Sequence, residues 1–235
     1  MSTTTSAGRT ARERARAELT HEIKQEARRQ LAATGAGGLS LRAVARELGM
    51  VSSALYRYFP SRDDLLTALI TDAYDALGAA AEAASTRPPA AGVRSRWRSA
   101  CAAVRDWARA HPHEYALIYG SPVPGYRAPA STIPAAARVA QVLGGLLGEA
   151  WATGTLAETP GEPLAPVLAR QAAGVAGAIA PGVPAPVIAR ALVAWTQLFG
   201  AISFELFGQL IGSADPADAF FGYAVEQMAD LVGLC

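Results

Sequence analysis

The feature that most constrains this chain is a glycine-punctuated segment at residues 39–65, LSLRAVARELGMVSSALYRYFPSRDDL. Ser40 suits a helix N-cap, because its hydroxyl can accept a hydrogen bond from an otherwise unpaired amide in the first turn. Apolar residues then recur at helical spacing up to Leu48, and Gly49 can adopt the left-handed conformation that ends a helix. A second short helix is expected at about residues 51–58. The segment therefore predicts a helix-turn-helix, whose second helix enters the major groove of DNA.

A capping pattern marks the start of the next helix. Pro60 interrupts the chain, and Ser61 followed three residues later by Asp64 is typical of a helix N-terminus. The residues that follow place one apolar stripe along a helix: Leu66, Leu69, Ile70, Ala73 and Leu77.

Side chains on the outer face of the two short helices are the candidates for contact with DNA. Serine and tyrosine hydroxyls commonly bind phosphates, and arginine binds phosphate or guanine. The predicted DNA-binding residues are Ser40, Arg42, Val51, Ser52, Ser53, Tyr56, Arg57, Tyr58 and Arg62. The alternative is an ordinary three-helix subdomain whose charges only face water.

The segment resembles the TetR family of transcriptional regulators over about residues 15–77. The family pattern is a capped helix, Ala-x-x-x-Gly and Leu-Tyr-x-His/Tyr-Phe-x-x-Lys/Arg-x-x-Leu, and it is matched by Ser40, Ala45, Gly49, Leu55, Tyr56, Tyr58, Phe59, Arg62 and Leu65. The chain departs from it at Val51, where serine is usual, and at Ser53, where glycine is usual. The resemblance implies an all-α homodimer with an N-terminal DNA-binding domain and a C-terminal ligand-binding domain. It also implies repression that a small molecule relieves.

Charge is divided unevenly along the 235 residues. Residues 1–64 hold eleven Lys and Arg against seven Asp and Glu, whereas residues 65–235 hold ten against thirteen. The positive end coincides with the helix-turn-helix, as attraction to phosphate requires. The expected divisions are a disordered or basic arm at residues 1–14, a three-helix DNA-binding domain at 15–62, a connecting helix at 63–84, and a larger helical ligand-binding and dimerisation domain at 85–235.

Aromatic residues of the C-terminal part supply the candidates for a ligand cavity. Such an inventory predicts a mostly apolar ligand with few polar anchors, although an aromatic stripe on a helix is more often plain core. The predicted ligand-binding residues are Trp97, Trp107, Tyr115, Tyr119, Tyr126, Trp195, Phe199 and, as the anchor for a cation, Glu205. A proline-rich and glycine-containing segment at about residues 120–134 is interpreted as a wall or lid of that cavity.

Two helices expected near residues 164–180 and 185–212 are apolar around much of their circumference. Such helices must be buried, and a four-helix interface with a second copy would bury them. A two-fold dimer also suits a palindromic operator on double-stranded DNA; the alternative is a monomer core that covers both helices. The apolar run from Ala191 to Phe204 is short for a bilayer, so no membrane partner is expected.

No residue pattern supports catalysis. His111, His113 and Glu114 are the only clustered candidate metal ligands, and a polar cap on the helix that begins at Pro112 is the favoured interpretation. We therefore expect no metal, no cofactor and no enzymatic activity. The two cysteines, Cys101 and Cys235, fit a reducing cytoplasm rather than a disulfide framework.

The sequence thus predicts a dimeric, cytoplasmic, DNA-binding repressor that an apolar small-molecule effector releases from its operator. Two alternatives remain. One is a ligand-independent activator or architectural protein of the same fold. The other is a ligand-binding or enzymatic protein whose helix-turn-helix is vestigial.

Overall fold

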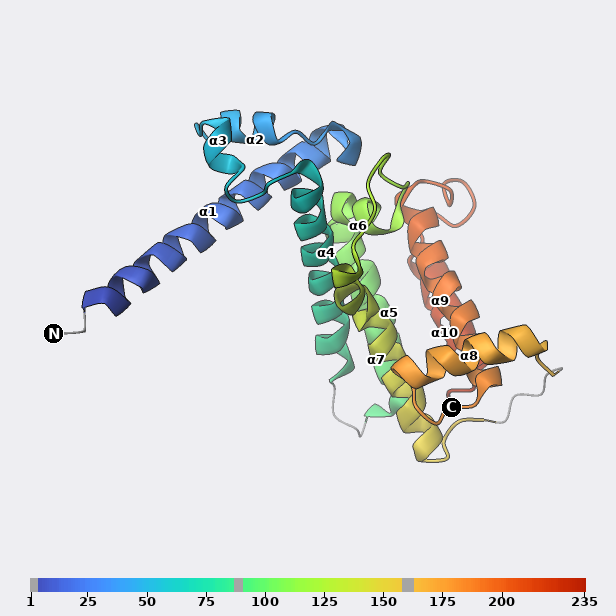
Figure 1. Cartoon of the computed structure of the whole chain (residues 1–235). Helices are drawn as coiled ribbons and strands as arrows, with labels where there is room; N and C mark the ends of the chain where they lie inside the picture. Colours follow the sequence, from blue (N-terminus) through green and yellow to red (C-terminus); the bar gives the residue numbers. More distant parts are fainter. Residues whose placement is uncertain (1–3, 87–90, 158–162) are drawn as a thin grey trace. The chain divides into compact units, whose positions relative to one another are not determined.

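The structure, a computed structural model, describes residues 4–86, 91–157 and 163–235. Within these ranges all regular elements are helices, apart from one isolated bridge between Leu156 and Leu234 (Figure 1). The predicted all-α fold class is confirmed.

The chain divides into two compact units. The first comprises Met1–Ala73 and His113–Thr132, and the second comprises Tyr74–Pro112 and Ile133–Cys235. The sequence predicts that His113–Thr132 belongs to the domain at 85–235, whereas this segment is part of the first unit. The polypeptide therefore passes from one unit to the other three times, and two of these passages lie within a helix, α4 and the first turn of α6.

The first unit is built on five helices and two 3-10 turns. Its elements are α1 (Thr4–Thr34), η1 (Ala36–Gly38), α2 (Leu41–Glu47), α3 (Ser52–Leu55), the first half of α4 (Arg62–Ser85), α6 (Pro112–Tyr119) and η3 (Ala130–Thr132). Side chains from α1 to α4, among them Ile23, Val44, Leu55, Phe59 and Leu66, form one buried core.

Helix α1 differs from expectation at its N-terminal end. We predicted a disordered or basic arm at residues 1–14, but α1 begins at Thr4, while residues 1–3 lie outside the described ranges. Between Arg12 and Arg16 the chain contains only Arg, Glu and Ala, which are good helix formers. The basic residues of this region are therefore carried on a helix.

Local signals set the path of the chain from α2 to α4. The Ser40 hydroxyl accepts a hydrogen bond from the amide of Ala43 at 3.4 Å, and Gly49 has the positive φ of 64° that the turn after α2 requires. The Ser61 hydroxyl accepts from the amide of Asp64 at 3.1 Å and donates to its carboxylate at 2.7 Å. Each helix boundary thus has the chemistry that the sequence indicated.

The segment between α6 and α7 packs within the first unit. We expected residues 120–134 to wall a ligand cavity, but Val123 and Tyr126 lie against the core of α1 to α4, as does Leu117 of α6. The Tyr126 hydroxyl is 2.9 Å from the Thr67 hydroxyl on α4. An aromatic residue with a polar tip suits this half-buried position, and no residue of 120–134 lines the cavity found in the second unit.

The candidate metal ligands are occupied elsewhere. The His111 ring stacks on Trp107 with a centroid distance of 5.0 Å, and its Nδ1 lies 3.0 Å from the Trp107 carbonyl oxygen. Glu114 forms an ion pair with Arg28, at 3.2 Å. Among the described residues, no group of three or more potential metal ligands occurs.

The second unit consists of long helices. Its elements are the second half of α4, α5 (Val93–Ala110), α7 (Ile133–Ala152), α8 (Pro166–Ile179), α9 (Ala185–Leu206) and α10 (Asp218–Val232). α9 packs on both α8 and α10, and α5 packs on α7 (Figure 1). A Cβ added at Gly144 of α7 would lie 2.7 Å from the carbonyl oxygen of Ile179, so glycine permits the close approach of α7 and α8.

Arginines connect the helices of the second unit. Arg138 of α7 binds Glu82 of α4 at 2.6 Å and Asp75 at 2.7 Å. Arg96 of α5 binds Glu149 of α7, also at 2.6 Å. These bidentate and paired contacts fix helix orientation more than they add stability, because most of them are partly exposed.

Helix α9 is longer than the apolar run that marked it. It spans Ala185–Leu206, 22 residues, and ends before Gly208, whose φ of 80° suits a turn. By length and composition alone the whole helix would suffice to cross a membrane, whereas the shorter run Ala191–Phe204 on which the expectation rested would not. Only 33% of its most apolar window is buried within one chain. Packing against α8 and α10 nevertheless gives it the position of a core helix.

Candidate functional site

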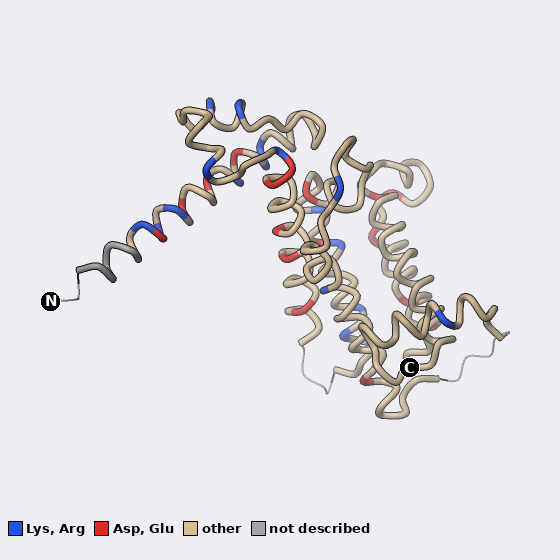
Figure 2. Tube along the Cα trace, in the orientation of Figure 1, with Lys and Arg blue, Asp and Glu red and all other residues tan. Residues whose placement is uncertain are grey.

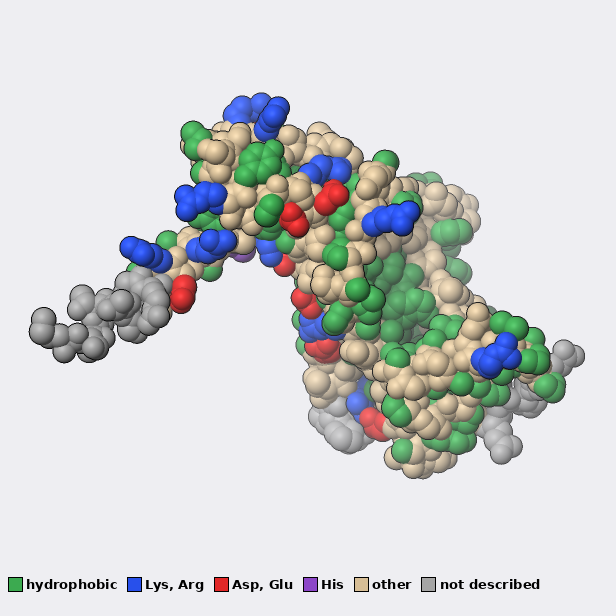
Figure 3. Space-filling model, in the orientation of Figure 1, with side chains coloured by type: hydrophobic (Ala, Val, Ile, Leu, Met, Phe, Trp, Pro, Cys, Tyr) green, Lys and Arg blue, Asp and Glu red, His purple; other side chains and the backbone are tan. Residues whose placement is uncertain are grey.

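The outer face of the helix-turn-helix is open to solvent. Val51, Ser53, Tyr56 and Arg57 are exposed around the short helix α3, and Arg42 is exposed on α2. Figure 2 shows Lys and Arg positions along α1, on α2 and beside α3, and Figure 3 shows basic side chains on the surface of this part of the molecule. Hydroxyl, guanidinium and small apolar groups on one convex surface can contact both phosphates and base edges.

Tyr58 links this surface to α1. The Arg16 guanidinium lies over the Tyr58 ring, 5.2 Å from its centroid, and donates a hydrogen bond to the carbonyl of Arg57 at 3.4 Å. Ser52 is half-buried at the first position of α3. α1 therefore supports the end of the recognition segment and brings a further cation beside it.

Two of the predicted DNA-binding residues face their own domain. Arg62 donates hydrogen bonds to the carbonyls of Ala36, at 2.7 Å, and Leu39, at 3.1 Å. Ser40 serves as the N-cap of α2. Both side chains stabilise the segment between α1 and α2. They therefore support the shape of the exposed helix-turn-helix surface.

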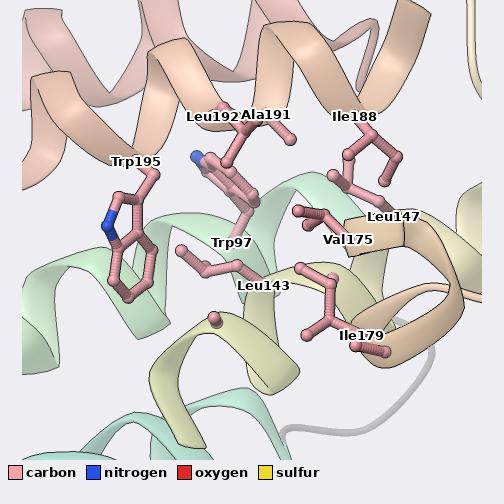
Figure 4. Close-up of a pocket in the computed structure, with 12 residues that line it drawn as sticks. Trp97, Leu143, Leu147, Val175, Ile179, Ile188, Ala191, Leu192 and Trp195 are labelled. Carbon is pink, nitrogen blue, oxygen red and sulfur yellow. The ribbon is translucent and has the colours of Figure 1, made fainter. Parts of the chain in front are cut away.

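The second unit contains a cavity of about 260 Å³ between four helices (Figure 4). Its walls are apolar side chains contributed by α5, α7, α8 and α9. The lining residues are Trp97, Ala140, Leu143, Gly144, Leu147, Val175, Ala178, Ile179, Ile188, Ala191, Leu192 and Trp195. Such a site can bind a small apolar molecule and has no side chain that could hold a metal ion.

Of the predicted ligand-binding residues, the structure places Trp97 and Trp195 on the cavity wall. The Phe199 ring packs beside the Trp195 ring, with ring centroids 4.6 Å apart. Trp107 is buried and stacks on His111 instead.

The three tyrosines of the ligand prediction belong to the first unit. Tyr115 is fully buried there, with its ring 5.2 Å from that of Tyr119, and Tyr126 packs on the helix-turn-helix core. None of them lines the cavity. Aromatic character alone did not distinguish these residues from the cavity-lining pair.

Glu205 is held in an ion-pair network. Arg105 donates to both of its carboxylate oxygens, at 2.6 and 2.7 Å, and to Asp218 at 2.9 Å. The hydrogen bond from Arg105 lowers the pKa of Asp218. Because the Arg105 side chain is only 8% exposed, its charge needs this carboxylate as a partner. Glu205 is therefore a structural counterion, and it does not line the cavity.

Sequence reasoning missed most of the aliphatic wall. Leu143, Leu147, Ile179, Ile188 and Leu192 line the cavity with the two tryptophans. Their helical spacing predicts a buried face but does not separate residues that fill a core from residues that leave a space. No local signal would have found them.

Two family descriptions match the chain. "Bacterial regulatory proteins, tetR family" matches residues 23–69, and "Tetracyclin repressor-like, C-terminal domain" matches residues 97–228. The first match contains the helix-turn-helix, and the second contains all the residues that line the cavity.

Individual relatives agree with the family matches. HTH-type transcriptional regulators of Mycobacterium tuberculosis and Mycobacterium bovis are each 40% identical over 201 residues, which is 83% of this chain and 83% of the relative. The crystal structure of the regulatory protein SCO4313 is 34% identical with a TM-score of 0.73, over 93% of this chain and 98% of that one. A protein of unknown function from Rhodococcus sp. RHA1 is 26% identical with a TM-score of 0.65, over 91% and 93%.

The exposed helix-turn-helix surface, the helical second unit and these similarities agree with one another, and the family is non-enzymatic. The chain belongs to the TetR family of HTH-type, DNA-binding transcriptional regulators.

Proposed function

We propose that the protein is a cytoplasmic repressor that a mostly apolar small molecule releases from a palindromic operator. The observation that carries the proposal is the apolar cavity between α5, α7, α8 and α9 in a chain that also presents a helix-turn-helix. An empty apolar cavity destabilises the fold because its walls lack van der Waals contacts, and a bound ligand restores those contacts. The regulatory unit would thus respond to a molecule that the DNA-binding unit never touches.

The release step is tested by filling the cavity. Ala191→Phe places a ring inside the wall, whereas Ala173→Phe adds the same ring at an exposed position of α8 outside it. Operator binding is measured by fluorescence anisotropy while apolar compounds are added. We expect compounds that release the wild type and Ala173→Phe to leave Ala191→Phe bound to DNA. Release of all three proteins would show that the effector does not act through this cavity, and release of none by any compound would favour a ligand-independent regulator.

We further propose that the functional form is a homodimer, joined through α9 and α10 and not through α8 and α9 as the sequence suggests. A groove of about 520 Å³ runs between these helices and beside the turn after α9. The residues that line the groove recur along one stripe of each helix: Gln197, Gly200, Ala201 and Phe204 on α9, and Phe220, Tyr223, Ala224 and Gln227 on α10. Phe204 is 54% and Tyr223 is 63% exposed. Large apolar groups beside small residues suit close packing against a second copy of the same two helices.

The dimer is tested by the double variant Phe204→Arg with Tyr223→Arg. Burying two like charges against their own copies should produce monomers in light scattering and lower operator affinity by about a thousandfold, because two half-sites are no longer engaged together. Val167→Arg, at a 57% exposed position of α8, is the matched control and should remain dimeric. A dimeric double variant would exclude this interface.

The mechanism we propose is a population shift. Ligand binding would favour a spacing of the two recognition helices that no longer fits successive major grooves. Helix α4 would carry the change, because it contributes residues to both units.

Spin labels at an exposed position of α2 test the shift. Glu47→Cys in a Cys235→Ser background gives one reactive thiol per protomer, since Cys101 is buried and burial raises the pKa of its thiol. The label-to-label distance should change when a releasing compound is added. Release without any change in that distance would exclude the mechanism.

A further inference from the structure

One polar group on the cavity wall has no partner in the protein. Trp97 is 2% exposed, and its Nε1 is buried without an acceptor among the described residues. An indole N–H can only donate, and buried donors are almost always hydrogen-bonded. The unpaired donor is therefore a feature that calls for an acceptor from outside the chain.

The donor lies beside other residues of the cavity wall. Figure 4 shows the nitrogen edge of the Trp97 indole on the side of Trp195 and Leu192, which line the same space. All twelve lining residues have apolar side chains or, in the two tryptophans, a donor only. The wall thus offers no side-chain acceptor to Trp97.

The charge and size of the cavity restrict which molecule can supply an acceptor to Trp97. No carboxylate lines the cavity to balance a cation, and no Lys or Arg lines it to balance an anion. Trp97 and Trp195 are the two aromatic residues among those that line the cavity, which is an incomplete aromatic cage for a cation. A 150 Å³ apolar cavity holds benzene, so by proportion about 260 Å³ holds about ten non-hydrogen atoms.

Resting on the repressor function proposed above, we infer that the effector is an uncharged, mostly hydrocarbon molecule with one acceptor oxygen, such as a small ketone, ester or lactone. Trp97 donates its indole N–H to that oxygen, and the aliphatic wall accommodates the hydrocarbon part. The tryptophan thereby selects among apolar molecules of equal size.

A pair of isosteric probes tests the inference on the full-length protein. Acetophenone and isopropenylbenzene have the same shape and number of non-hydrogen atoms, but only the ketone accepts a hydrogen bond. Because the chain has four tryptophans, a protein labelled with ¹⁵N in its indoles gives four side-chain N–H signals. Trp97→Phe and Trp195→Phe assign two of them.

We expect acetophenone to bind roughly tenfold more tightly than isopropenylbenzene and to move the Trp97 N–H signal downfield. Replacing Trp97 by benzothienylalanine, in which sulfur replaces the indole N–H, should remove the preference while both probes still bind. The Trp195 signal reports occupancy of the cavity in every case.

The outcomes separate this inference from the function on which it rests. Equal binding of the two probes, or a preference that survives the sulfur replacement, would overturn the role of Trp97 and leave the apolar effector cavity standing. Stronger binding of benzyltrimethylammonium would overturn the uncharged class in the same way. No shift of either cavity tryptophan with any probe would contradict the cavity as an effector site, and with it the proposed function.

Discussion

The two units of the chain hold their functional groups in opposite ways. In the first unit, the residues predicted to contact DNA lie on or beside α2 and α3, close together in the sequence, and most of them are exposed. In the second, the cavity is enclosed by residues that extend from Trp97 to Trp195 and belong to four helices. An exposed surface such as the one on α2 and α3 is determined by a local sequence motif. A cavity of the second kind exists only as a result of long-range packing, and it can change its ligand without changing the motif.

The first consequence is that a charge added to the exposed surface should damage function without damaging the fold. Ser53→Glu places a carboxylate on the outer side of α3, where it would repel phosphate, and should weaken operator binding by about 100-fold at unchanged stability. Anisotropy titrations with an operator duplex measure the loss. Gln171→Glu, which adds the same charge to the exposed side of α8, should bind normally. Equal losses in both variants would mean that net charge, and not this surface, determines affinity.

In the second unit, the corresponding change should damage the fold. Glu205→Gln removes the charge that Arg105 needs while it preserves the shape of the side chain. The free energy of unfolding, from urea titration, should fall by about 2 kcal/mol because a largely buried cation loses its counterion. Asp230→Asn alters a more exposed pair with Arg94 and should cost under about 0.5 kcal/mol. A stable Glu205→Gln protein with altered ligand affinity would return this residue to the role of ligand anchor.

Helix capping provides a smaller test in the first unit. Ser40→Ala removes the hydroxyl that accepts from the amide of Ala43, and the unfolding free energy should decrease by about 1 kcal/mol. Ser53→Ala, at an exposed serine that does not cap a helix, is the control and should leave stability within about 0.5 kcal/mol. If Ser40→Ala instead lowered DNA affinity at unchanged stability, this serine would be a direct contact.

The smallest expected effect concerns acid. Hydrogen bonds from Arg98 and Arg94 lower the pKa of Glu226 from 4.5 to about 2. Its contribution to stability is therefore complete above pH 4.5 and is lost as pH falls toward 2. Since the side chain is 34% exposed, this contribution is under about 1 kcal/mol. Urea titrations of Glu226→Gln between pH 3 and 7 should show a flatter pH dependence than the wild type, and an identical dependence would rule out the pair as its source.

The helix-turn-helix could be predicted because its signals are short-range. Ser40, Gly49 and the Ser61–Asp64 pair mark helix boundaries through contacts within a few residues, and the structure has those contacts. The sequence could not show which polar side chains remain available to contact DNA. Arg62, for example, donates hydrogen bonds to the carbonyls of Ala36 and Leu39, more than twenty residues away.

The second site was only partly predictable for the same reason. Trp97 and Trp195 were expected on the cavity wall and lie there, whereas Tyr115, Tyr119 and Tyr126 belong to the first unit. An aromatic side chain can pack in a core, anchor a loop or line a cavity. Tertiary packing decides which of these positions it takes. The partner of Glu205 is also set by tertiary structure, because Arg105 is a hundred residues away in sequence.

The central claim, that this chain recognises a specific DNA sequence, is tested most directly by a genome-wide selection of bound fragments followed by affinity measurements. The dissociation constants for the selected duplex and an unrelated duplex are compared across a salt series. The account predicts a preference of about a thousandfold or more, with affinity that falls steeply as salt rises. Equal weak binding to both duplexes, with no site recovered from the genome, would contradict it.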